Sequence, residues 1–225
     1  MEYAGLDAKK RAVRIIKLLQ AATKGMVPAA SVSIVQEFGR DPYLVLASCL
    51  LSLRTKDSVS LPASQRLFRL AKTPEQMLKV PLSEIEKVIY PTGFYRNKAK
   101  LLHSVSQDLL DRFDGKVPSN VDDLLSIKGV GLKTANLTLA EGFGIPAICV
   151  DTHVHRISNR LGLVKTKTPE ETEHELKKII PEEYWREYNH LMVMWGQNVC
   201  VPISPFCSKC VLAPICPQIG ITKKR

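Results

Sequence analysis

One lysine stands directly behind a pair of glycines, in the segment 129-GVGLKTAN-136. The two glycines allow a tight turn, and the apolar spacing on either side predicts helix, turn and helix over residues 121–143. Lys133 then lies at the positive end of the second helix dipole, which disfavours the ammonium form and lowers the pKa of the amine. A lysine that is neutral part of the time can act as a nucleophile. The alternative is a solvated lysine that helps to hold a phosphate.

The turn before this lysine favours an anion. Gly129 and Gly131 let another group approach the backbone, and amides at the start of the following helix point outward. A DNA backbone phosphate fits such a site without a base contact, so recognition there is independent of sequence. The alternative is an ordinary helical hairpin whose glycines only close the turn. The segment alone leaves both interpretations open.

A carboxylate at Asp151 is the second candidate for chemistry. A helix over about 134–143 rises roughly 15 Å. Residues 144–150, largely extended, can cover up to about 23 Å on the return. Asp151 can thus come back beside the helix start that carries Lys133. An isolated Asp here is most simply the N-cap of a helix over 152–160, and an ionised carboxylate facing an activated amine is the more specific interpretation.

Four cysteines near the end of the sequence have the spacing C-x6-C-x2-C-x5-C: Cys200, Cys207, Cys210 and Cys216. Four thiolates this close together can surround one metal centre. Zinc sites usually pair two short elements across a longer gap, whereas these cysteines form one compact loop. The spacing therefore favours an iron–sulfur cluster over zinc. The other two cysteines, Cys49 and Cys149, lie in apolar runs and are predicted to be core residues.

The charge balance favours a polyanionic partner. Lys plus Arg number 32 against 22 for Asp plus Glu, and each cation set against a phosphate releases counterions. A merely soluble basic protein, or one attracted to anionic lipid, has the same balance. The longest apolar stretch, 42–53, is too short to span a bilayer and is predicted to be a buried helix. Residues 1–20 mix charges in an amphipathic pattern unlike a signal peptide, so we expect a cytoplasmic protein, nucleoid-associated if prokaryotic.

Helix signals recur along the chain and strand signals are nearly absent. Three segments combine a Ser or Thr N-cap with a Glu or Gln three residues later: 73–76, 83–86 and 168–171. Residues 98–113 have apolar side chains at helical spacing, and the only strand-like run, 145–150, contains a proline. Pro62 requires that its helix start near Ser60 or be kinked. We predict an all-α protein of roughly ten helices.

These features together resemble the endonuclease III family of DNA glycosylases, in the helix-hairpin-helix-GPD superfamily. The resemblance runs from about Phe38 to Cys216, and is carried by 50-LLSLRTKD-57, 93-GFYRNKAK-100, 127-IKGVGLKTAN-136, 150-VDTHVHR-156 and the four-cysteine loop. It implies two all-α domains. One is a helical barrel at 39–143 that includes the hairpin, and the other joins 1–38 to 144–225 and carries a [4Fe-4S] cluster.

The resemblance also implies an activity, that of a bifunctional DNA glycosylase and AP lyase of base-excision repair. Its substrates would be oxidised pyrimidines in duplex DNA. We expect the protein to be a monomer and expect no membrane partner. Lys133 would attack C1′ of the flipped nucleotide, Asp151 would assist departure of the base, and the resulting Schiff base would permit β-elimination. Arg could not replace the lysine because a guanidinium stays protonated. Two alternatives are a T:G mismatch glycosylase and a non-catalytic, metal-stapled DNA-binding module.

The resemblance implies several DNA contacts. The hairpin residues concerned are Lys128, Gly129, Gly131 and Thr134. Arg54 stands where bacterial relatives commonly have glutamine, at the position that fills the gap left by the flipped base. Phe94 falls near the usual wedge, where an aromatic ring could stack, and its alternative is core packing. Loop 201–206 lacks the basic residues of relatives, so we expect DNA contacts from Lys209 and from residues 223–225, Lys223, Lys224 and Arg225, instead.

Overall fold

The computed structural model describes residues 7–225, and over that range the chain is helical and has no strand. This confirms the predicted all-α class. The helices are α1 (Ala8–Ala22), α2 (Ala30–Phe38), α3 (Pro42–Ser52), α4 (Asp57–Leu70), α5 (Pro74–Lys79), α6 (Leu82–Ile89), α7 (Tyr95–Phe113), α8 (Val121–Ser126), α9 (Leu132–Leu137), α10 (Thr152–Arg160), α11 (Pro169–Ile179) and α12 (Trp185–Asn198). Shorter turns are the π-helix η1 (Thr138–Phe143) and the 3₁₀ helices η2 (Glu182–Tyr184), η3 (Cys207–Lys209) and η4 (Ala213–Ile215). None of the described helices is long and apolar enough to cross a membrane.

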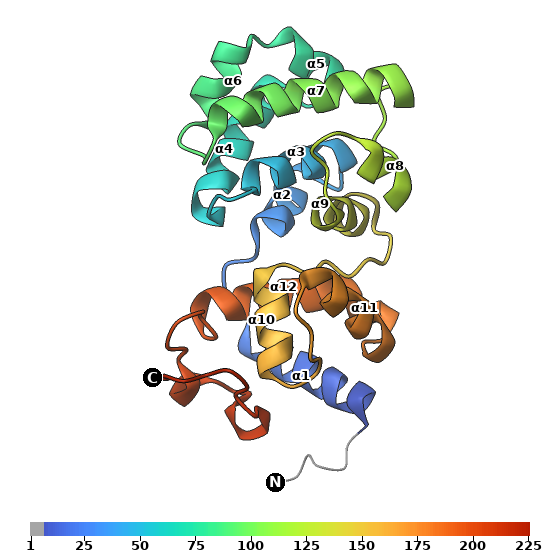
Figure 1. Cartoon of the computed structure of the whole chain (residues 1–225). Helices are drawn as coiled ribbons and strands as arrows, with labels where there is room; N and C mark the ends of the chain where they lie inside the picture. The colour runs from blue at the N-terminus through green and yellow to red at the C-terminus, as the bar shows by residue number, and fades with distance from the viewer. Residues whose placement is uncertain (1–6) are drawn as a thin grey trace. The chain divides into compact units, whose positions relative to one another are not determined.

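The chain divides into two compact units. Unit 1 combines the described residues up to Pro28 with Pro146–Arg225, and unit 2 is Ala29–Ile145. In Figure 1 the blue N-terminal helix α1 accordingly lies with the orange C-terminal helices, whereas α2 to α9 form the other unit. Helix α2, which the sequence analysis grouped with the C-terminal segment, belongs to unit 2. Its Phe38 ring meets the Phe68 ring of α4 edge-on, with centroids 5.5 Å apart.

Helix α3 is the centre of unit 2. Its apolar sequence has no polar face, and every residue from Tyr43 to Leu51 is buried. Helices α2, α4, α7 and α9 and the π-helix η1 pack around it. The Asp41 carboxylate caps α3 by accepting the amides of Tyr43 at 2.8 Å and Leu44 at 3.1 Å. The predicted buried helix at 42–53 is therefore confirmed.

Two of the three predicted N-caps are confirmed. The Thr73 hydroxyl accepts the amide of Gln76 at 3.3 Å at the start of α5. The Thr168 hydroxyl accepts the amide of Glu171 at 3.2 Å at the start of α11. In both helices the third side chain also accepts the amide of the residue before the cap. Gln76 accepts from Lys72, and Glu171 accepts from Lys167, an arrangement close to a capping box.

The predicted cap at Ser83 is wrong. Helix α6 begins at Leu82, because the Pro81 carbonyl accepts the amides of Glu84 at 2.9 Å and Ile85 at 3.1 Å. Ser83 therefore lies inside the first turn, where its hydroxyl cannot cap the helix. The fixed φ of a proline suits it to a helix start, and that local preference decided the boundary.

Helix α4 begins at Asp57 and not near Ser60, with Pro62 inside it. The Asp57 carboxylate serves another helix, because it accepts the amide of Ala30 at 3.2 Å at the start of α2. This bond ties α2 to α4 and gives a second reason why α2 belongs to unit 2.

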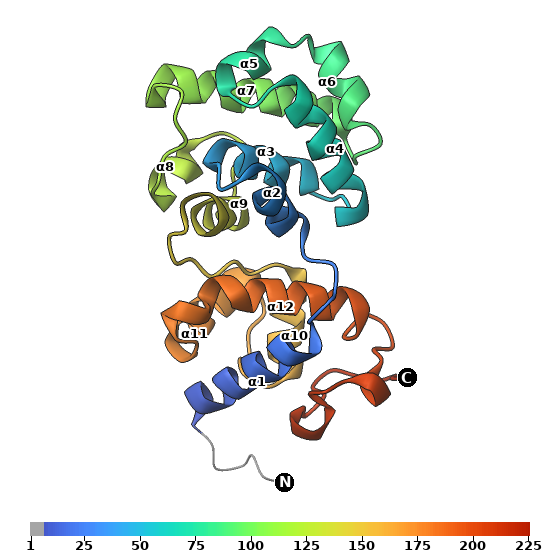
Figure 2. The same cartoon turned by 180° about the vertical axis from the view of Figure 1, so that it is seen from behind.

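Unit 1 is built around the packing of α10 and α12. Figure 2 shows α1 lying along α12, and the two helices share a buried core. Tyr188 is fully buried there, and its hydroxyl lies 2.8 Å from that of Ser158. Residues 146–150 enter the unit as extended chain and not as a strand. The side-chain amide of Asn189 satisfies the carbonyl of Cys149 at 2.9 Å, and both Cys49 and Cys149 are buried as predicted.

Candidate functional site

Helices α8 and α9 form the predicted hairpin. The turn between them is closed by the amide of Val130, which donates to the carbonyl of Ile127 at 3.0 Å, and Gly131 is the N-cap of α9. The guanidinium of Arg112 holds the end of α8 by donating to the hydroxyl of Ser126 at 2.6 Å and to its carbonyl at 3.3 Å. A long helix, α7, thus fixes the hairpin from behind.

The two glycines of the hairpin have different reasons to be glycine. Gly129 has φ +91°, and a Cβ placed there would lie 2.5 Å from the Leu101 side chain, so the fold itself requires glycine. Gly131 has φ −94°, a value open to any residue. A Cβ there would meet nothing within 4 Å. The fold therefore does not explain glycine at 131, and space beside the start of α9 remains for another molecule.

Lys133 is the second residue of α9 and is exposed, as are Lys128 and Gly129 of the turn. The buried thiol of Cys49 lies within electrostatic range of it. Burial raises the pKa of Cys49 to about 12, and the charge of Lys133 opposes this rise only in part. The thiol therefore keeps its proton at neutral pH, so it places no negative charge beneath the amine that would favour the ammonium form.

Thr134, another expected DNA contact, is buried in α9. It is only 3 % exposed, and Thr138, one turn later, donates its hydroxyl to the Thr134 carbonyl at 2.8 Å. A DNA contact from the Thr134 side chain is therefore excluded in this conformation. Only its backbone amide, in the first turn of α9, remains for that role.

Asp151 is the N-cap of α10. One carboxylate oxygen, Oδ1, accepts the amides of His153 at 2.8 Å and Val154 at 2.9 Å. The predicted cap is thus confirmed, and two bonds to one oxygen fix the orientation of the carboxylate. Asp151 belongs to unit 1 and Lys133 to unit 2.

Arg54 and Phe94 lie side by side, although forty residues separate them in the chain. Arg54 is in the loop between α3 and α4, and Phe94 is the N-cap of α7. The guanidinium carbon is 5.8 Å from the centroid of the ring, which is within cation–π range. Phe94 is 62 % exposed, so core packing does not explain it. Both residues have left-handed backbone, with φ +52° and +58°.

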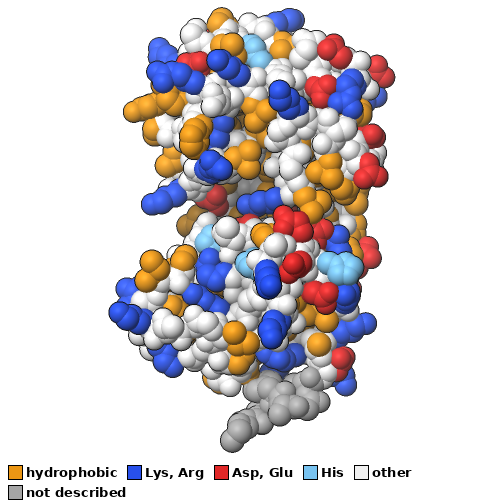
Figure 3. Space-filling model, in the orientation of Figure 1, with side chains coloured by type: hydrophobic (Ala, Val, Ile, Leu, Met, Phe, Trp, Pro, Cys, Tyr) orange, Lys and Arg blue, Asp and Glu red, His pale blue; other side chains and the backbone are white. Residues whose placement is uncertain are grey.

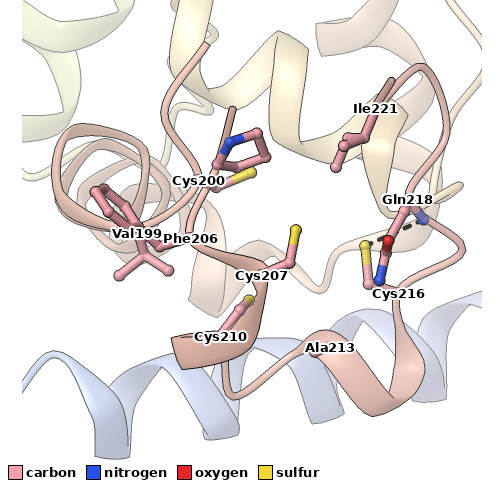
Figure 4. A pocket seen from close by; sticks show the side chains of 10 residues that line it. Val199, Cys200, Phe206, Cys207, Cys210, Ala213, Cys216, Gln218 and Ile221 are labelled. Atoms are coloured by element: carbon pink, nitrogen blue, oxygen red, sulfur yellow. Dashed lines mark hydrogen bonds between the residues drawn. The ribbon is translucent and has the colours of Figure 1, made fainter. Parts of the chain in front are cut away.

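The four cysteines of the 200–216 loop line one pocket. Their thiols are free, and Figure 4 shows the sulfur atoms facing a common space from different sides. Apolar side chains complete the lining, among them Val199, Pro205, Phe206 and Ile221. Among residues 7–225 no three His, Cys, Asp or Glu side chains gather tightly enough to hold a metal ion. The sulfurs therefore stand around the wall of the pocket and do not converge on one point.

The surroundings of the pocket suit a group that accepts hydrogen bonds. The amide of Gln218 donates to the Cys216 sulfur at 3.4 Å, and the guanidinium of Arg160 donates to the Cys200 sulfur at 3.4 Å. The buried indole N–H of Trp195 is directed at the Cys210 sulfur, where it lowers the pKa of that thiol, and it makes no other hydrogen bond among the described residues. Three of the four cysteines pack against the core that contains this tryptophan. An acceptor held in the pocket would find donors already in place.

Burial raises the pKa of Cys210 and of Cys216. Their neutral thiol forms are therefore favoured in this apolar setting. Binding of a metal centre needs thiolates, so the positive charge of the bound metal must compensate for the cost of deprotonation. The four cysteines fit a metal group that is ligated by thiolates. Without such a group, burial keeps the Cys210 and Cys216 thiols protonated.

Two arginines of α10 hold the first cysteine loop, and the sequence analysis missed both. Arg160 is only 9 % exposed, and its guanidinium donates to the carbonyls of Val201 at 2.8 Å and Pro202 at 2.6 Å. Arg156, one turn earlier, donates to the carbonyl of Cys200 at 2.9 Å. The sequence signal was a pair of arginines four residues apart, a spacing that places both on one face of a helix.

Basic residues around the cysteine loop are of two kinds. Lys209 and Lys223 are exposed, as the sequence analysis expected. Lys224 donates to the side chain of Gln218 at 2.8 Å. Arg225 donates to the carbonyl of Ser204 at 3.0 Å, and its guanidinium carbon lies 3.9 Å from the centre of the Phe206 ring. Arg225 is exposed as well, and these contacts fasten the tail to the loop, while its expected DNA contact stays a prediction.

Charge is distributed unevenly on the surface. On the face shown in Figure 3, Lys and Arg side chains are spread widely, whereas acidic side chains gather around α11 and also along the edge formed by the ends of α7 and α8. The acidic residues there are Asp108, Asp111, Asp114, Asp122 and Asp123. A polyanion would be repelled from that edge and attracted elsewhere.

Comparison with known proteins places this geometry in a family. Residues 47–182 match the family model described as HhH-GPD superfamily base excision DNA repair protein. Endonuclease III of Thermotoga maritima is 44 % identical over 196 residues, which is 85 % of this chain and 92 % of that protein. Endonuclease III-like protein 1 of Mus musculus is 43 % identical over 178 residues, which is 78 % of this chain and 59 % of the longer mouse protein.

Solved structures agree with the sequence comparisons. A non-covalent endonuclease III–DNA complex matches with a TM-score of 0.83 at 34 % identity, over 95 % of this chain and 97 % of that one. A trapped endonuclease III–DNA covalent intermediate matches with a TM-score of 0.82 at the same identity and coverage. A thermostable thymine-DNA glycosylase, at 23 % identity with a TM-score of 0.73 over 90 % of this chain and 96 % of that one, shares the fold alone. With its glycine hairpin, its lysine and its four-cysteine loop, the chain belongs to the endonuclease III family of the HhH-GPD superfamily.

Proposed function

We propose that this protein is a bifunctional DNA glycosylase and AP lyase of base-excision repair. It removes oxidised pyrimidines from duplex DNA and then nicks the strand at the abasic site. The observation that carries the proposal is Lys133, an exposed amine in the first turn of α9 behind an open glycine hairpin. A related endonuclease III has been trapped as a covalent intermediate with DNA, and an amine at this position is the group such a bond needs.

Lys133 is proposed to act as the nucleophile. Its neutral amine attacks C1′ of the damaged nucleotide, and the bond from C1′ to the base breaks with its electron pair leaving on the base, which takes up a proton. The nitrogen then loses one proton, the C1′–O4′ bond breaks with its electron pair on O4′, which takes up a proton, and the nitrogen lone pair forms a protonated Schiff base with C1′. Loss of a proton from C2′ then expels the 3′ phosphate oxygen, which breaks the strand. The position of Lys133 in the first turn of α9, at the positive end of the helix dipole, suits the neutral amine that the first step needs.

Asp151 is proposed to stabilise the positive charge that develops on the sugar as the base departs. A carboxylate suits this role only if its orientation is fixed before the reaction. The two amide bonds to Oδ1 at the start of α10 supply that constraint.

The hairpin is proposed to hold a backbone phosphate of the DNA at the start of α9. The open space at Gly131 supports this proposal, because nothing in the folded chain requires glycine there. Lys128 adds an exposed cation to the same turn. Such contacts carry no base preference, which suits an enzyme that must find damage in any sequence.

Two alanine substitutions separate the structural glycine from the DNA-binding one. Gly129→Ala should lower the free energy of unfolding by about 1–2 kcal/mol, because φ +91° is strained for a residue with a Cβ. Gly131→Ala should change stability by less than about 0.5 kcal/mol, yet weaken binding to an abasic duplex. Chemical denaturation and fluorescence anisotropy measure the two effects. If Gly131→Ala bound the abasic duplex as tightly as the wild type, the proposal that a DNA phosphate binds beside Gly131 would be wrong.

The four cysteines are proposed to hold a [4Fe-4S] cluster, which endonuclease III family members usually bind. The four cysteines line one pocket, and their compact spacing within a single loop supports an iron–sulfur cluster over zinc, whose sites usually pair two short elements across a longer gap. A bound cluster would supply four iron–sulfur bonds that close the 200–216 loop. Arg156 and Arg160 would hold the backbone of that loop, and Trp195 would donate to the bound group.

Loss of one ligand tests this assignment. Cys210→Ala should abolish the visible absorbance near 400 nm and reduce bound iron from about four atoms per chain to near zero. The matched control is Cys49→Ala, which removes a buried thiol of unit 2 and should leave the iron content unchanged. Metal analysis of purified protein gives the measurement. One zinc and no iron in the wild-type protein would contradict the cluster.

A substrate panel tests the function as a whole. Duplexes that contain thymine glycol, an abasic site or a T:G mismatch are incubated with the protein, with and without borohydride. We expect base release and nicking with thymine glycol, nicking of the abasic duplex, and trapping with both. Activity confined to T:G would make the protein a mismatch glycosylase. Salt-sensitive binding without any scission would make it a DNA-binding module.

A further inference from the structure

A buried lysine lies behind the exposed pair Arg54 and Phe94. Lys98, in the first turns of α7, is 5 % exposed. Its Nζ donates to the carbonyl of Leu51 at 2.6 Å and to the hydroxyl of Thr55 at 2.7 Å. Burial of a lysine is costly, so full burial beside a surface loop calls for a function.

Thr55 connects this lysine to the second loop. Its hydroxyl oxygen accepts from Lys98 and also from the amide of Gly93 at 3.0 Å, while its own hydrogen points to the carbonyl of Leu53 at 3.3 Å. The two acceptor positions and the one donor of the hydroxyl are therefore all used. The hydroxyl of Thr55 thus links the loop that carries Arg54 to Gly93, the residue before Phe94, and Lys98 holds that hydroxyl in place.

The backbones of the two loops are in direct contact at this point. A Cβ on Gly93 would lie 2.9 Å from the carbonyl oxygen of Arg54, so only glycine allows the approach. Arg54 and Phe94 both have left-handed backbone, a conformation that side chains larger than glycine adopt only when surrounding contacts impose it. The bonds of Lys98 and Thr55 are those contacts.

The protonation state of Lys98 agrees with this arrangement. Burial lowers its pKa to about 8, so the amine is mostly protonated at neutral pH and all its hydrogens can be donated. One acceptor, the Leu51 carbonyl, lies in the last turn of α3, where a helix dipole favours a positive charge. Lys98 is thus charged, buried and unable to reach solvent, which leaves it without a direct role in DNA contact.

We propose that Lys98 is a positioning residue that fastens two loops into one wedge, so that Arg54 and Phe94 enter the stacked bases of duplex DNA together. The wedge fills the space that the flipped nucleotide leaves: the ring of Phe94 stacks on a neighbouring base, and the guanidinium of Arg54 meets the base opposite. This inference rests on the proposed function, because it assigns a step that precedes the chemistry at Lys133.

The test compares duplex with single-stranded substrate, because a single strand needs no wedge. Lys98→Met keeps the apolar stem of the side chain and removes the ammonium. On an abasic duplex it should lower the single-turnover cleavage rate by at least about tenfold, since displacement of positioning groups by about 1 Å costs up to 10²-fold. On a single-stranded abasic oligonucleotide its rate should match the wild type. A 2-aminopurine opposite the lesion should show a smaller fluorescence increase on binding.

Matched variants separate positioning from loss of charge or of fold. Lys100→Met removes an exposed charge from the same helix and should leave the duplex rate and the fluorescence change unaltered. Thr55→Val removes the bridging hydroxyl at constant shape and should behave like Lys98→Met, whereas Thr55→Ser should restore the wild-type response. Equal rates of Lys98→Met and wild type on the duplex would overturn the inference, as would equal losses on both substrates.

The single-stranded substrate also keeps this inference apart from the proposed function. Wild-type protein that cleaves neither abasic substrate overturns the lyase chemistry itself, and the wedge inference fails with it. Wild-type protein that cleaves both substrates, with Lys98→Met and Thr55→Val unimpaired on the duplex, overturns the wedge alone.

Discussion

Replacement of Lys133 with glutamine is expected to abolish both nicking of an abasic duplex and borohydride trapping, with a loss of at least about 10³-fold in the cleavage rate. Glutamine has similar length and reach but no nucleophilic nitrogen, so the covalent bond to C1′ cannot form. Affinity for the duplex should fall only modestly, because one exposed charge out of many is lost. Single-turnover kinetics and denaturing gels of the reduced adduct provide the measurement.

Lys128→Gln is the matched control for Lys133→Gln. It removes an exposed lysine from the same hairpin, so it should weaken DNA binding most at low salt, and reduce the salt dependence of binding, yet leave the trapped adduct intact. Chelation by EDTA should not affect either nicking or trapping by the wild type, since an amine nucleophile needs no divalent ion. If Lys133→Gln were trapped as efficiently as the wild type, Lys133 could not be the nucleophile, whatever the effect of the substitution on DNA binding.

Asp151→Asn is expected to slow base release from a thymine glycol duplex by about 10²–10³-fold, the usual effect of losing one preorganised electrostatic contact. The substitution removes the negative charge and keeps an oxygen that can accept the amides of His153 and Val154. Asn is as good an N-cap as Asp, so the free energy of unfolding should change by less than about 0.5 kcal/mol.

Asp151→Ala separates the two roles of this residue. It removes the charge and the cap, so it should show the same loss of base release and, in addition, a loss of about 0.5–2 kcal/mol in stability. Dissociation constants for an abasic-site analogue complete the comparison. An Asp151→Asn enzyme that releases base at the wild-type rate would reduce Asp151 to a structural cap.

Much of the fold was predictable because its signals are local. The caps at Thr73 and Thr168 depend on side chains three residues away, and both predictions hold. The buried helix α3 and the N-cap role of Asp151 follow from short-range patterns in the same way. The cysteine spacing predicted a shared pocket, because ligands so close in the chain cannot lie far apart in space.

The features that the sequence did not predict depend on contacts between distant segments. Helix α2 belongs to unit 2 because Phe38 meets Phe68 and Asp57 binds its first turn. The burial of Thr134 follows from the tight packing of α9 on α3. Lys98 reads as an ordinary exposed lysine in 98-KAKLLHSV-105, and only the folded chain brings Leu51 and Thr55 to its amine.

Mass spectrometry of the borohydride-reduced complex with an abasic duplex tests the central claim most directly. Proteolysis of the adduct should give a single modified peptide that contains Lys133, with the reduced sugar joined to its Nζ. A modification on any other amine, or the absence of an adduct in protein that still binds the duplex, would contradict the account.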